Sequence, residues 1–581
     1  MVAIYQLFLN FVSDIGGKIS HLPPAETIIF DIALILILCA VFAFIAKVLR
    51  QPLIPAYVLA GLIIGPLVLG FADNMEMILA FSEIGIAFLL FTAGLEIAFS
   101  KIKEANLKKI VLIGFFQVLI IVGVVFLLRD FLGLSVLQAS YIGIIMAFGS
   151  TMVDIKLLAD SGEIVTLHGR LVLGILLFQD LVAIIAIVIF TTGGFTTSLI
   201  MFSIGKLFLL ILIAMFLQNF VLNKLFRFAA KSTELLFLAS LGVLFLFIIL
   251  AYVSEISIVI GAFIAGVSLA NSPFKIELES RIIPLRDFFA ILFFVALGMQ
   301  IVFVGIGSHI VLFIALLMGA FILKPFITFV LLRITGYQQK TSFHVSTSLA
   351  QLSEFSLIIG MLGVSRGILD QSIFSTVILA TIISMSATPY FINYKEYSYK
   401  AFKYPLKLFR FFPQRENLEY KNIGDEDILI IGSHRMGGVL MKKLLKHKER
   451  LLVIDYNPEI ISHLIKKKVS CIYGDITSPE ILNKVNIKKL KLVVSTVPNF
   501  RENLHLLRVI KSINPRTEVI VTGSRISETI RLYNKGADYV ITPKILAGEE
   551  LTRVIRSNKK TIRKLKNEHL KHLRDIHNLF Y

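Results

Sequence analysis

The sequence is poor in charged residues and in cysteine for its length. Charged residues make up 17% of its 581 residues, whereas soluble globular proteins carry about 25%. The two cysteines, Cys39 and Cys471, fall in regions of different composition, which excludes a disulfide framework and a cysteine-based metal cluster. The first residues lack the basic start and the small-residue cleavage site of a secretory signal peptide, so we expect no cleaved leader.

Apolar residues account for 56% of the chain and are unevenly distributed. Long apolar runs continue to about residue 394, and beyond that point charged residues become frequent and the runs shorten. This change predicts a membrane part followed by a soluble part. The expected boundaries are an outer N-terminal segment at 1–27, a membrane domain at 28–394, a linker at 395–425, a soluble domain at 426–556 and a basic tail at 557–581.

The membrane domain is predicted to contain thirteen transmembrane helices, because about twenty apolar residues cross the hydrocarbon core of a bilayer. Loops after odd-numbered spans are rich in lysine and arginine, and loops after even-numbered spans are poor in them. This alternation predicts an outside N-terminus and a cytoplasmic soluble domain in the cell (inner) membrane. The spans lie near residues 28–49, 53–71, 77–99, 107–129, 136–158, 166–191, 199–222, 235–252, 254–271, 285–303, 309–333, 343–364 and 372–394.

The net charge of +19 raises the question of a polyanionic partner. Much of this charge lies in the short loops between spans and in the tail from Arg556 to Arg574. Basic residues in these positions indicate contact with anionic lipid headgroups. We therefore expect membrane lipids, and no nucleic acid, as the partners of the basic residues.

Several polar residues interrupt the apolar runs at depths where each needs a protein or water partner. Asp180, next to Gln179, has apolar residues for a full turn or more on either side, and we interpret it as functional. The fifth and twelfth spans are interrupted in the same manner, which is typical of paired discontinuous helices in inverted-repeat transporters. The interrupting residues are Ser150, Thr151, Asp154, Gln351, Ser353 and Glu354.

Structural interpretations of these residues stay open. The hydroxyl groups of Ser150 and Thr151 are of the type that bonds back to the preceding helical turn. Lys324, near the middle of the eleventh span, either reaches toward an interface or pairs with a core carboxylate, for which Asp180 is the first choice and Asp154 the second. Asp154 and Glu354 lie closer to span ends, where solvated caps are the alternative.

Six segments of the membrane domain carry motifs: LRQPLIPAYVLAGLIIGPLVLGF (49–71), FSEIGIAFLLFTAGLEIAFSKI (81–102), GSTMVDIKLL (149–158), FQDLVAI (178–184), IGAFIAGVSLANSPFKIELESRIIPLRDFFAILFFVALGMQI (260–301) and LAQLSEFSLIIG (349–360). Together they resemble the monovalent cation:proton antiporter-2 family. With the soluble domain included, the chain is similar to the glutathione-gated potassium-efflux antiporters. The resemblance implies a thirteen-helix fold with a dimerisation bundle and a core bundle, worked by an elevator-like movement, and a homodimer.

The resemblance also implies a site where the fifth and twelfth spans cross, next to Asp180. Gln179 followed by Asp180 is the potassium-efflux pattern, whereas electrogenic sodium antiporters carry paired acids or Asn-Asp there. Lys324 matches the basic residue of the family's corresponding late span. Asp154 departs from the family pattern, and three roles stay open for it: an extra cation ligand, a partner for Lys324, or a solvated charge facing the cytoplasm.

Physical chemistry assigns Asp180 a role without the resemblance. Burial favours the protonated form of a carboxyl group, so that proton exchange falls in the physiological range. A protonated aspartate binds no cation, whereas an ionised one binds Na⁺ or K⁺. If only the loaded states cross the membrane, one site exchanges a proton for a cation, with neutral oxygens from Gln179, Ser150 and Thr151.

From Asp427 onward the sequence alternates short strands and helices. Residues 427–459, DILIIGSHRMGGVLMKKLLKHKERLLVIDYNPE, have the order strand, tight turn, helix, strand and acidic end. This alternation predicts an α/β Rossmann-like domain with a doubly wound parallel sheet. Further strands are expected in CIYGD (471–475), KLVVSTVPN (491–499), TEVIVTGS (517–524) and DYVITP (538–543).

The turn GSHRMG (432–437) is an incomplete dinucleotide fingerprint, because His434 replaces the second glycine of G-x-G-x-x-G. Asp455 lies about twenty residues beyond the turn, as a ribose-binding acid would. The domain resembles the RCK (potassium-conductance-regulating) domain over 426–556, which implies a regulatory nucleotide such as AMP, ATP or NAD(H). The candidate binding residues are Gly432, Ser433, His434, Arg435, Met436, Gly437, Asp455, Gly474, Asp475 and Thr496. A Rossmann fold that only dimerises is the alternative.

Three classes of function compete. The leading one is a secondary K⁺ or Na⁺/H⁺ antiporter, not an enzyme, gated by a cytoplasmic nucleotide-binding domain. A ligand-gated potassium channel is the second, but the sequence has no TVGYG-like filter. The third is an oxidoreductase that uses the Rossmann domain, for which the sequence offers no convincing catalytic group. The choice between K⁺ and Na⁺ and the identity of the gating ligand are not determined by the sequence.

Overall fold

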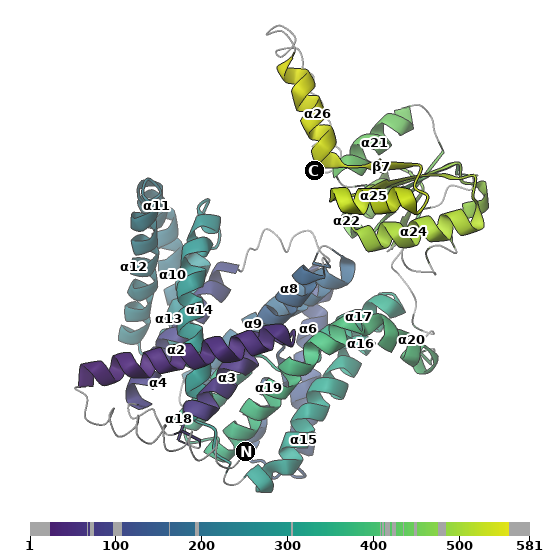
Figure 1. Ribbon diagram of the computed structural model, residues 1–581. Helices are drawn as coiled ribbons and strands as arrows, with labels where there is room; N and C mark the ends of the chain where they lie inside the picture. Colours follow the sequence, from purple (N-terminus) through teal and green to yellow (C-terminus); the bar gives the residue numbers. More distant parts are fainter. Residues whose placement is uncertain are drawn as a thin grey trace, which may run out of the picture. The chain divides into compact units, whose positions relative to one another are not determined.

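The computed structural model divides into two compact units, Met1–Ile164 with His168–Pro413, and Gln414–Tyr581 with Val165–Leu167. Figure 1 labels most of their helices and strand β7. The described residues are 24–66, 68–69, 75–96, 107–161, 163–164, 166–191, 197–303, 306–406, 408–409, 412, 419–420, 426–433, 435–446, 450–474, 481 and 484–556. The expected outer segment at 1–27 lies largely outside these residues, and the basic tail at 557–581 lies wholly outside them.

The membrane unit is built from helices. They are α2 (Pro24–Val48), α3 (Leu53–Ile64), α4 (Met75–Glu96), α6 (Leu107–Leu128), α7 (Val136–Ala147), α8 (Thr151–Asp160), α9 (Leu167–Thr191), α10 (Thr197–Leu217), α11 (Asn223–Ala229), α12 (Thr233–Val253), α13 (Ile258–Leu269), α14 (Lys275–Met299), α15 (Ile310–Met318), α16 (Lys324–Ile334), α17 (Gln339–Ser348), α18 (Glu354–Ser365), α19 (Gln371–Asn393) and α20 (Lys395–Leu406). Two π-helical segments, η1 (Gln218–Leu222) and η3 (Gly319–Leu323), join α10 to α11 and α15 to α16.

Among the described residues, ten helical segments are long and apolar enough to cross a membrane by length and composition. Three shorter apolar helices, α3, α13 and α18, lie at the predicted second, ninth and twelfth spans. The prediction of a helical membrane domain is therefore confirmed. The count of thirteen transmembrane helices stays a prediction.

Two predicted spans are discontinuous, as expected. Residues 148–150 separate α7 from α8, and residues 349–353 separate α17 from α18. Ser150 and Ser353 are the N-cap residues of α8 and α18, and their hydroxyl oxygens accept hydrogen bonds from backbone N–H groups of the first turn. The Nε2 of Gln351 donates to the carbonyl of Ser150 at 3.1 Å, so the two breaks lie against each other.

Glycines allow some helices to cross at backbone contact. A Cβ atom at Gly61 of α3 would lie 2.1 Å from the carbonyl oxygen of Val295 in α14, and one at Gly298 would lie 2.1 Å from the carbonyl oxygen of Val58. Such close approach is typical of small residues at membrane helix interfaces. The crossing fixes α3 against α14, and both helices line the cavity described below.

The soluble unit contains a seven-stranded sheet in its described residues, in the order β1-β4-β3-β2-β5-β6-β7. Only β1 runs antiparallel to its neighbour among the paired strands. The strands are β1 (Glu419–Tyr420), β2 (Ile428–Ile431), β3 (Leu451–Asp455), β4 (Cys471–Tyr473), β5 (Leu492–Ser495), β6 (Glu518–Thr522) and β7 (Tyr539–Ile541). The doubly wound parallel sheet is therefore confirmed, with the strand order of a Rossmann fold.

Helices cover both faces of this sheet. Leu429 and Ile431 of β2 belong to one buried cluster with Leu507 of α24, and Ile428 and Ile430 belong to another with Ile461 of α22. Strands buried on both faces explain the continuous apolar runs ILII and LLVI in the sequence. The helices are α21 (Arg435–Lys446), α22 (Pro458–Lys466), α24 (Phe500–Ile513), α25 (Ile526–Asn534) and α26 (Pro543–Ile555).

Candidate functional site

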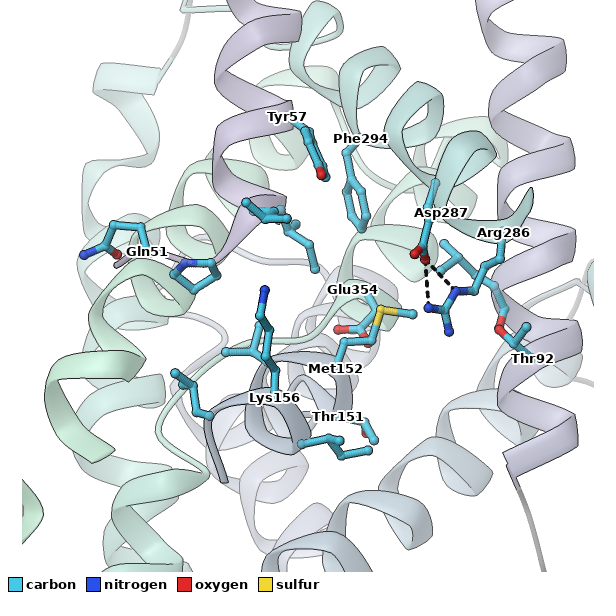
Figure 2. A pocket seen from close by; sticks show the side chains of 18 of the residues that line it. Gln51, Tyr57, Thr92, Thr151, Met152, Lys156, Arg286, Asp287, Phe294 and Glu354 are labelled. Carbon is cyan, nitrogen blue, oxygen red and sulfur yellow. Dashed lines mark hydrogen bonds and ion pairs between the residues drawn. The ribbon is translucent and has the colours of Figure 1, made fainter. Parts of the chain in front are cut away.

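A cavity of about 860 Å³ penetrates the membrane unit. Its walls come from α2, α3, α4, α8, α9, α14, α18 and α19, and three of the predicted transport residues, Thr151, Asp180 and Glu354, line it. Figure 2 shows Thr151 and Lys156 on α8 opposite Tyr57 and Phe294. The cavity gives small ions and water access to the region where the broken helices meet.

The walls of the cavity carry charges of both signs. Lys47, Arg50, Lys156 and Arg286 are its basic lining residues, and Asp160 and Asp287 face the same space. Arg286 and Asp287 form an ion pair at 2.8 Å, which Figure 2 marks with dashed lines. Several basic groups therefore lie along the route that a cation would take to Asp180.

Asp180 lies on α9, and its side chain is 7% exposed. The hydroxyl of Thr151 donates to its Oδ2 at 2.8 Å. Because Thr151 is the first residue of α8, this bond joins the carboxylate to the start of a broken helix. The resulting group is one carboxylate and one hydroxyl at the inner surface of the cavity, both oxygen donors suited to a monovalent cation.

Gln179 is turned into the protein. Its Oε1 accepts from the backbone N–H of Gly149 at 2.9 Å, and its Nε2 donates to Oε1 of Gln117 at 3.1 Å. The amide of Gln179 therefore fastens the break between α7 and α8 to α9 and α6. Its oxygen, expected as a cation ligand, is occupied by the backbone in this structure.

Gln117 is a residue that the sequence analysis missed. It is fully buried in the middle of α6. The available signal was a single amide within an otherwise apolar run from Ile110 to Leu128, in a place where a polar side chain needs a partner. Its partner, Gln179, lies on a different helix, so the pairing itself was not readable from either segment.

Lys324 is also fully buried, which excludes the interpretation that it reaches an interface. Its Nζ donates to the carbonyl of Gln351 at 2.7 Å, within the second break. Of the two expected carboxylate partners, it is Asp154, and not the first choice Asp180, whose charge acts on Lys324. Asp154 is itself fully buried, so the solvated role that was open for it is wrong.

Glu354 is the first residue of α18, is 4% exposed and lines the cavity. Its carboxylate interacts with the Ser150 side chain and with the backbone of Met152, at the N-terminus of α8. The hydroxyl of Ser353 also donates to it at 3.4 Å. Asp154 lies in the first turn of α8. Both acids therefore lie where the helix dipole favours a negative charge.

The second break is held by α19. The Oε1 of Gln351 accepts from the hydroxyl of Thr388 at 2.7 Å, and the backbone N–H of Leu352 donates to Ser384 Oγ at 3.1 Å. Thr388 and Ser384 were also missed by the sequence analysis. Their signal was a pair of hydroxyl residues four positions apart in the last span, on one helical face.

In the soluble unit, the predicted turn directly follows β2. Strands β2 and β5 are neighbours in the sheet, and the strand order reverses between them. Gly432 has φ +77°, and a Cβ atom there would lie 2.8 Å from the hydroxyl oxygen of Thr496. That hydroxyl donates to the carbonyl of Gly432 at 2.8 Å. A Cβ atom at Gly437 would lie 1.9 Å from the same carbonyl, so α21 packs closely on the turn. Crevices at such reversals are the usual ligand sites of these sheets.

Asp455 ends β3 and points to this turn. Its Oδ2 accepts from the backbone N–H of Ser433 at 2.7 Å, and its Oδ1 accepts from the N–H of Asn457 at 2.8 Å. The structure thus brings Gly432, Ser433, Gly437, Asp455 and Thr496 together. Arg435 and Met436 begin α21, and Gly474, with φ +157°, follows β4. His434 and Asp475 lie outside the described residues.

Comparison with known proteins assigns the two units. The family model for the transmembrane sodium/hydrogen exchanger matches residues 33–393, and the model for the TrkA-N domain matches residues 428–543. The glutathione-regulated potassium-efflux system protein KefC of Escherichia coli (strain K12) is 28% identical over 494 residues, covering 83% of this chain and 77% of that protein.

Solved structures are similar to each unit. The sodium proton antiporter MjNhaP1 from Methanocaldococcus jannaschii is 19% identical and has a TM-score of 0.49, covering 65% of this chain and 97% of that chain. The TrkA-N domain of the inner membrane protein ybaL from Escherichia coli is 22% identical and has a TM-score of 0.23, covering 23% of this chain and all of that domain.

These findings define a multi-pass membrane cation/proton antiporter with a regulatory TrkA-N domain. The chain belongs to the sodium/hydrogen exchanger family. The predicted resemblance to antiporters that carry an RCK domain is confirmed, and the relatives are transporters.

Proposed function

We propose that Asp180 is the exchange site, which binds a proton and a monovalent cation in alternation. The observation that carries this proposal is its position at the cavity surface, with the Thr151 hydroxyl 2.8 Å from Oδ2. A carboxylate that reaches water and also contacts a broken helix can release its proton to the cavity and take up a cation. When Asp180 binds a proton or a monovalent cation, its negative charge is neutralised. The loaded, neutral site can then move across the membrane.

The surrounding charges support a single exchanging carboxylate. Asp154 and Glu354 are opposed by the Lys324 ammonium and by the N-termini of α8 and α18, each of which carries about half a positive charge. These fixed charges nearly cancel, so the charge of Asp180 remains for the transported ion. One cation then exchanges for one proton, and the cycle moves no net charge.

Potassium is the first cation to test. The relative KefC is named as a potassium-efflux system, and the Gln179–Asp180 pair is the potassium-efflux pattern. The proposed ligands are Asp180, Thr151 and nearby backbone carbonyls, with Gln179, Ser150, Asp154, Lys324, Gln351, Ser353 and Glu354 in supporting roles. Sodium is the other possible cargo, because both ions prefer oxygen ligands.

We infer that the soluble domain regulates transport by binding a nucleotide and does not convert that nucleotide. The positive end of α21 and the glycine turn are suited to a phosphate group, and Asp455 to ribose hydroxyls. His434 in place of the second glycine favours a mononucleotide such as AMP at least as much as NAD(H). The name of KefC, a glutathione-regulated protein, supports control by a ligand.

We further propose a homodimer in the cell (inner) membrane, with the N-terminus outside and the soluble domain in the cytoplasm. The basic loops support this orientation. Apolar side chains exposed on α26 of the soluble unit, among them Leu551 and Ile555, support contact with a second copy. Light scattering of the detergent-solubilised protein tests the dimer, and labelling of single engineered cysteines in intact cells tests the orientation.

The exchange itself is tested in proteoliposomes. A pH gradient is imposed, and its collapse is followed with a pH-sensitive dye after addition of K⁺ or Na⁺. We expect K⁺ to collapse the gradient, and a membrane voltage to leave the rate unchanged. A rate that depends on voltage would contradict one-for-one exchange, and cation flux without proton movement would indicate a channel.

A further inference from the structure

Helix α20, which follows the last span, is packed into the membrane unit and is not a free tether. The cluster of Phe329, Phe343 and Tyr399 joins α16, α17 and α20, and Phe409 packs against it. Figure 1 shows α20 beside α16 and α17. The chain continues from this segment to the regulatory domain. Three polar contacts connect the segment to the helices that build the cation site.

The first contact joins α20 to α9, which carries Asp180. The ammonium of Lys395, the first residue of α20, pairs with Oε2 of Glu163, which lies between α8 and α9. The Nε2 of His168 lies 3.0 Å from the same Oε2 and 3.4 Å from the Lys395 nitrogen. His168 is in the first turn of α9, about 18 Å along the helix from Asp180.

The second contact joins α20 to α17, which leads into the break at residues 349–353. Glu396 pairs with Lys340 at 2.8 Å and lies 3.6 Å from Nε2 of His344. The ring of Tyr399 packs on His344, with centroids 6.1 Å apart. Neighbouring residues at the start of α20 therefore hold two different helices of the cation site.

The third contact joins the segment after α20 to α16, whose first residue is Lys324. Arg333, at the other end of α16, is 1% exposed. Its guanidinium donates to the carbonyls of Phe409 at 3.3 Å and Phe412 at 3.2 Å. The guanidinium also donates to the carbonyl of Tyr337, outside the segment. Displacement of the segment would therefore remove two of the acceptors that this buried charge needs.

Glu163 is ionised in its contact with Lys395. Burial alone would raise the pKa of Glu163, but the hydrogen bond from His168 and the Lys395 ammonium together lower it to about 2. Glu163 therefore remains ionised at all pH values at which exchange would be measured. Removing Lys395 leaves this partly buried carboxylate without its ammonium partner, and α9 without its tie to α20.

We propose that α20 is the coupling element between the regulatory domain and the cation site, and that the Lys395–Glu163–His168 cluster transmits its position to α9. The inference rests on the proposed regulation by the soluble domain. A displacement of α20 changes the restraint on three helices together: α9, which carries Asp180, α16, which begins with Lys324, and α17, which leads into the break that contains Gln351.

The test compares Lys395→Met with Lys400→Met in full-length protein. Lys400 is an exposed lysine on the same helix and is the matched control. Exchange is measured in proteoliposomes with and without AMP or NADH on the side of the soluble domain. We expect Lys395→Met to change the basal rate about fivefold or more, at the lower end of allosteric coupling, and to reduce the nucleotide response. The half-saturating cation concentration should stay the same, and the charge-swapped pair Lys395→Glu with Glu163→Lys should restore part of the response.

Hydrogen exchange of residues 167–175 gives a second readout that needs no nucleotide. It should be faster in Lys395→Met than in wild type and unchanged in Lys400→Met. If Lys395→Met keeps the wild-type exchange rate, the wild-type nucleotide response and the wild-type protection from hydrogen exchange, the proposed coupling role is wrong. If the wild-type chain exchanges no cation, the proposed function fails instead. If the wild-type chain exchanges cations but does not respond to AMP or NADH, only the proposed nucleotide regulation fails. The basal transport rate and the hydrogen-exchange protection of Lys395→Met then still test the coupling role of α20.

Discussion

The proposed cation site and the proposed nucleotide-binding turn both bring a carboxylate to the N-terminus of a helix, but in different surroundings. In the membrane unit, Asp154 and Glu354 lie in the first turns of α8 and α18 and are almost completely buried. In the soluble unit, Asp455 comes from a neighbouring strand and accepts from the N–H of Ser433, just before α21. The same helix-end electrostatics therefore serves two purposes.

The difference follows from the solvent around each helix end. Water is scarce inside a membrane protein, so N–H groups at a broken helix must find partners within the chain. The hydroxyls of Ser150 and Ser353 provide such partners for the first turns of α8 and α18, and Asp180 is the carboxylate that we propose exchanges ions. In the soluble unit, water can occupy the N-terminus of α21, so the protein can leave it open for a phosphate.

The strongest test of this comparison removes the exchanging carboxylate. Asp180→Asn keeps the shape of the side chain but can neither bind nor release a proton. We expect exchange in proteoliposomes to fall to the background of protein-free vesicles, with wild-type insertion and melting temperature. The control is Asp160→Asn, which neutralises another acid of the same cavity and should remain active. Exchange at a near wild-type rate in Asp180→Asn would contradict the mechanism.

The second test unbalances the fixed charges. Lys324→Ala leaves Asp154 buried without its opposing charge, which should lower the free energy of unfolding by about 3–5 kcal/mol. Thermal unfolding of the detergent-solubilised protein measures this loss. The double variant Lys324→Ala with Asp154→Asn should recover part of it, because the uncompensated charge is gone. If Lys324→Ala melts at the same temperature as wild type at neutral pH, Lys324 and Asp154 do not stabilise each other.

Features with a local cause could be predicted from the sequence. Hydroxyl residues such as Ser150 and Ser353 within apolar runs indicated where the helices break, because they can cap a new helix. The apolar runs ILII and LLVI, each followed by a turn, indicated the strands of the parallel sheet. In both cases the signal and the structure that it causes lie within a few residues of each other.

The contacts between segments could not be predicted in the same way. That Gln179 faces Gln117 and the Gly149 N–H depends on the packing of α6 beside α9, which no single segment determines. The interaction of Lys324 with Asp154 likewise depends on how the two breaks cross. The role of α20 was also not evident, because its sequence resembles a basic linker and its anchors, Glu163 and Arg333, are distant in the chain.

A third test concerns the amide chain that holds the first break. Gln117→Leu leaves the Nε2 of Gln179 without its acceptor, at a cost of about 1–3 kcal/mol in the free energy of unfolding. We expect slower exchange with an unchanged ion specificity. Gln179→Leu should cost more, because it also leaves the N–H of Gly149 unpaired. The double variant should cost no more than Gln179→Leu alone, and simple additivity of the two losses would show that the residues act separately.

The smallest expected effect is in the soluble unit, where the helix end is left for a ligand. Asp455→Ala removes the acceptor for the ribose hydroxyls and also the bond that holds the N–H of Ser433. We expect AMP to bind about tenfold more weakly, roughly 1.4 kcal/mol in binding free energy, as measured by calorimetry on the full-length protein. Asp455→Asn is the matched comparison variant, because its amide oxygen can still accept from the N–H of Ser433 while the negative charge is lost. Transport should respond less to AMP in both variants, and its cation dependence should not change, because Asp180 is untouched. If wild type binds neither AMP, ATP nor NAD(H), the turn is a structural element, and the domain acts on the transporter through contact alone.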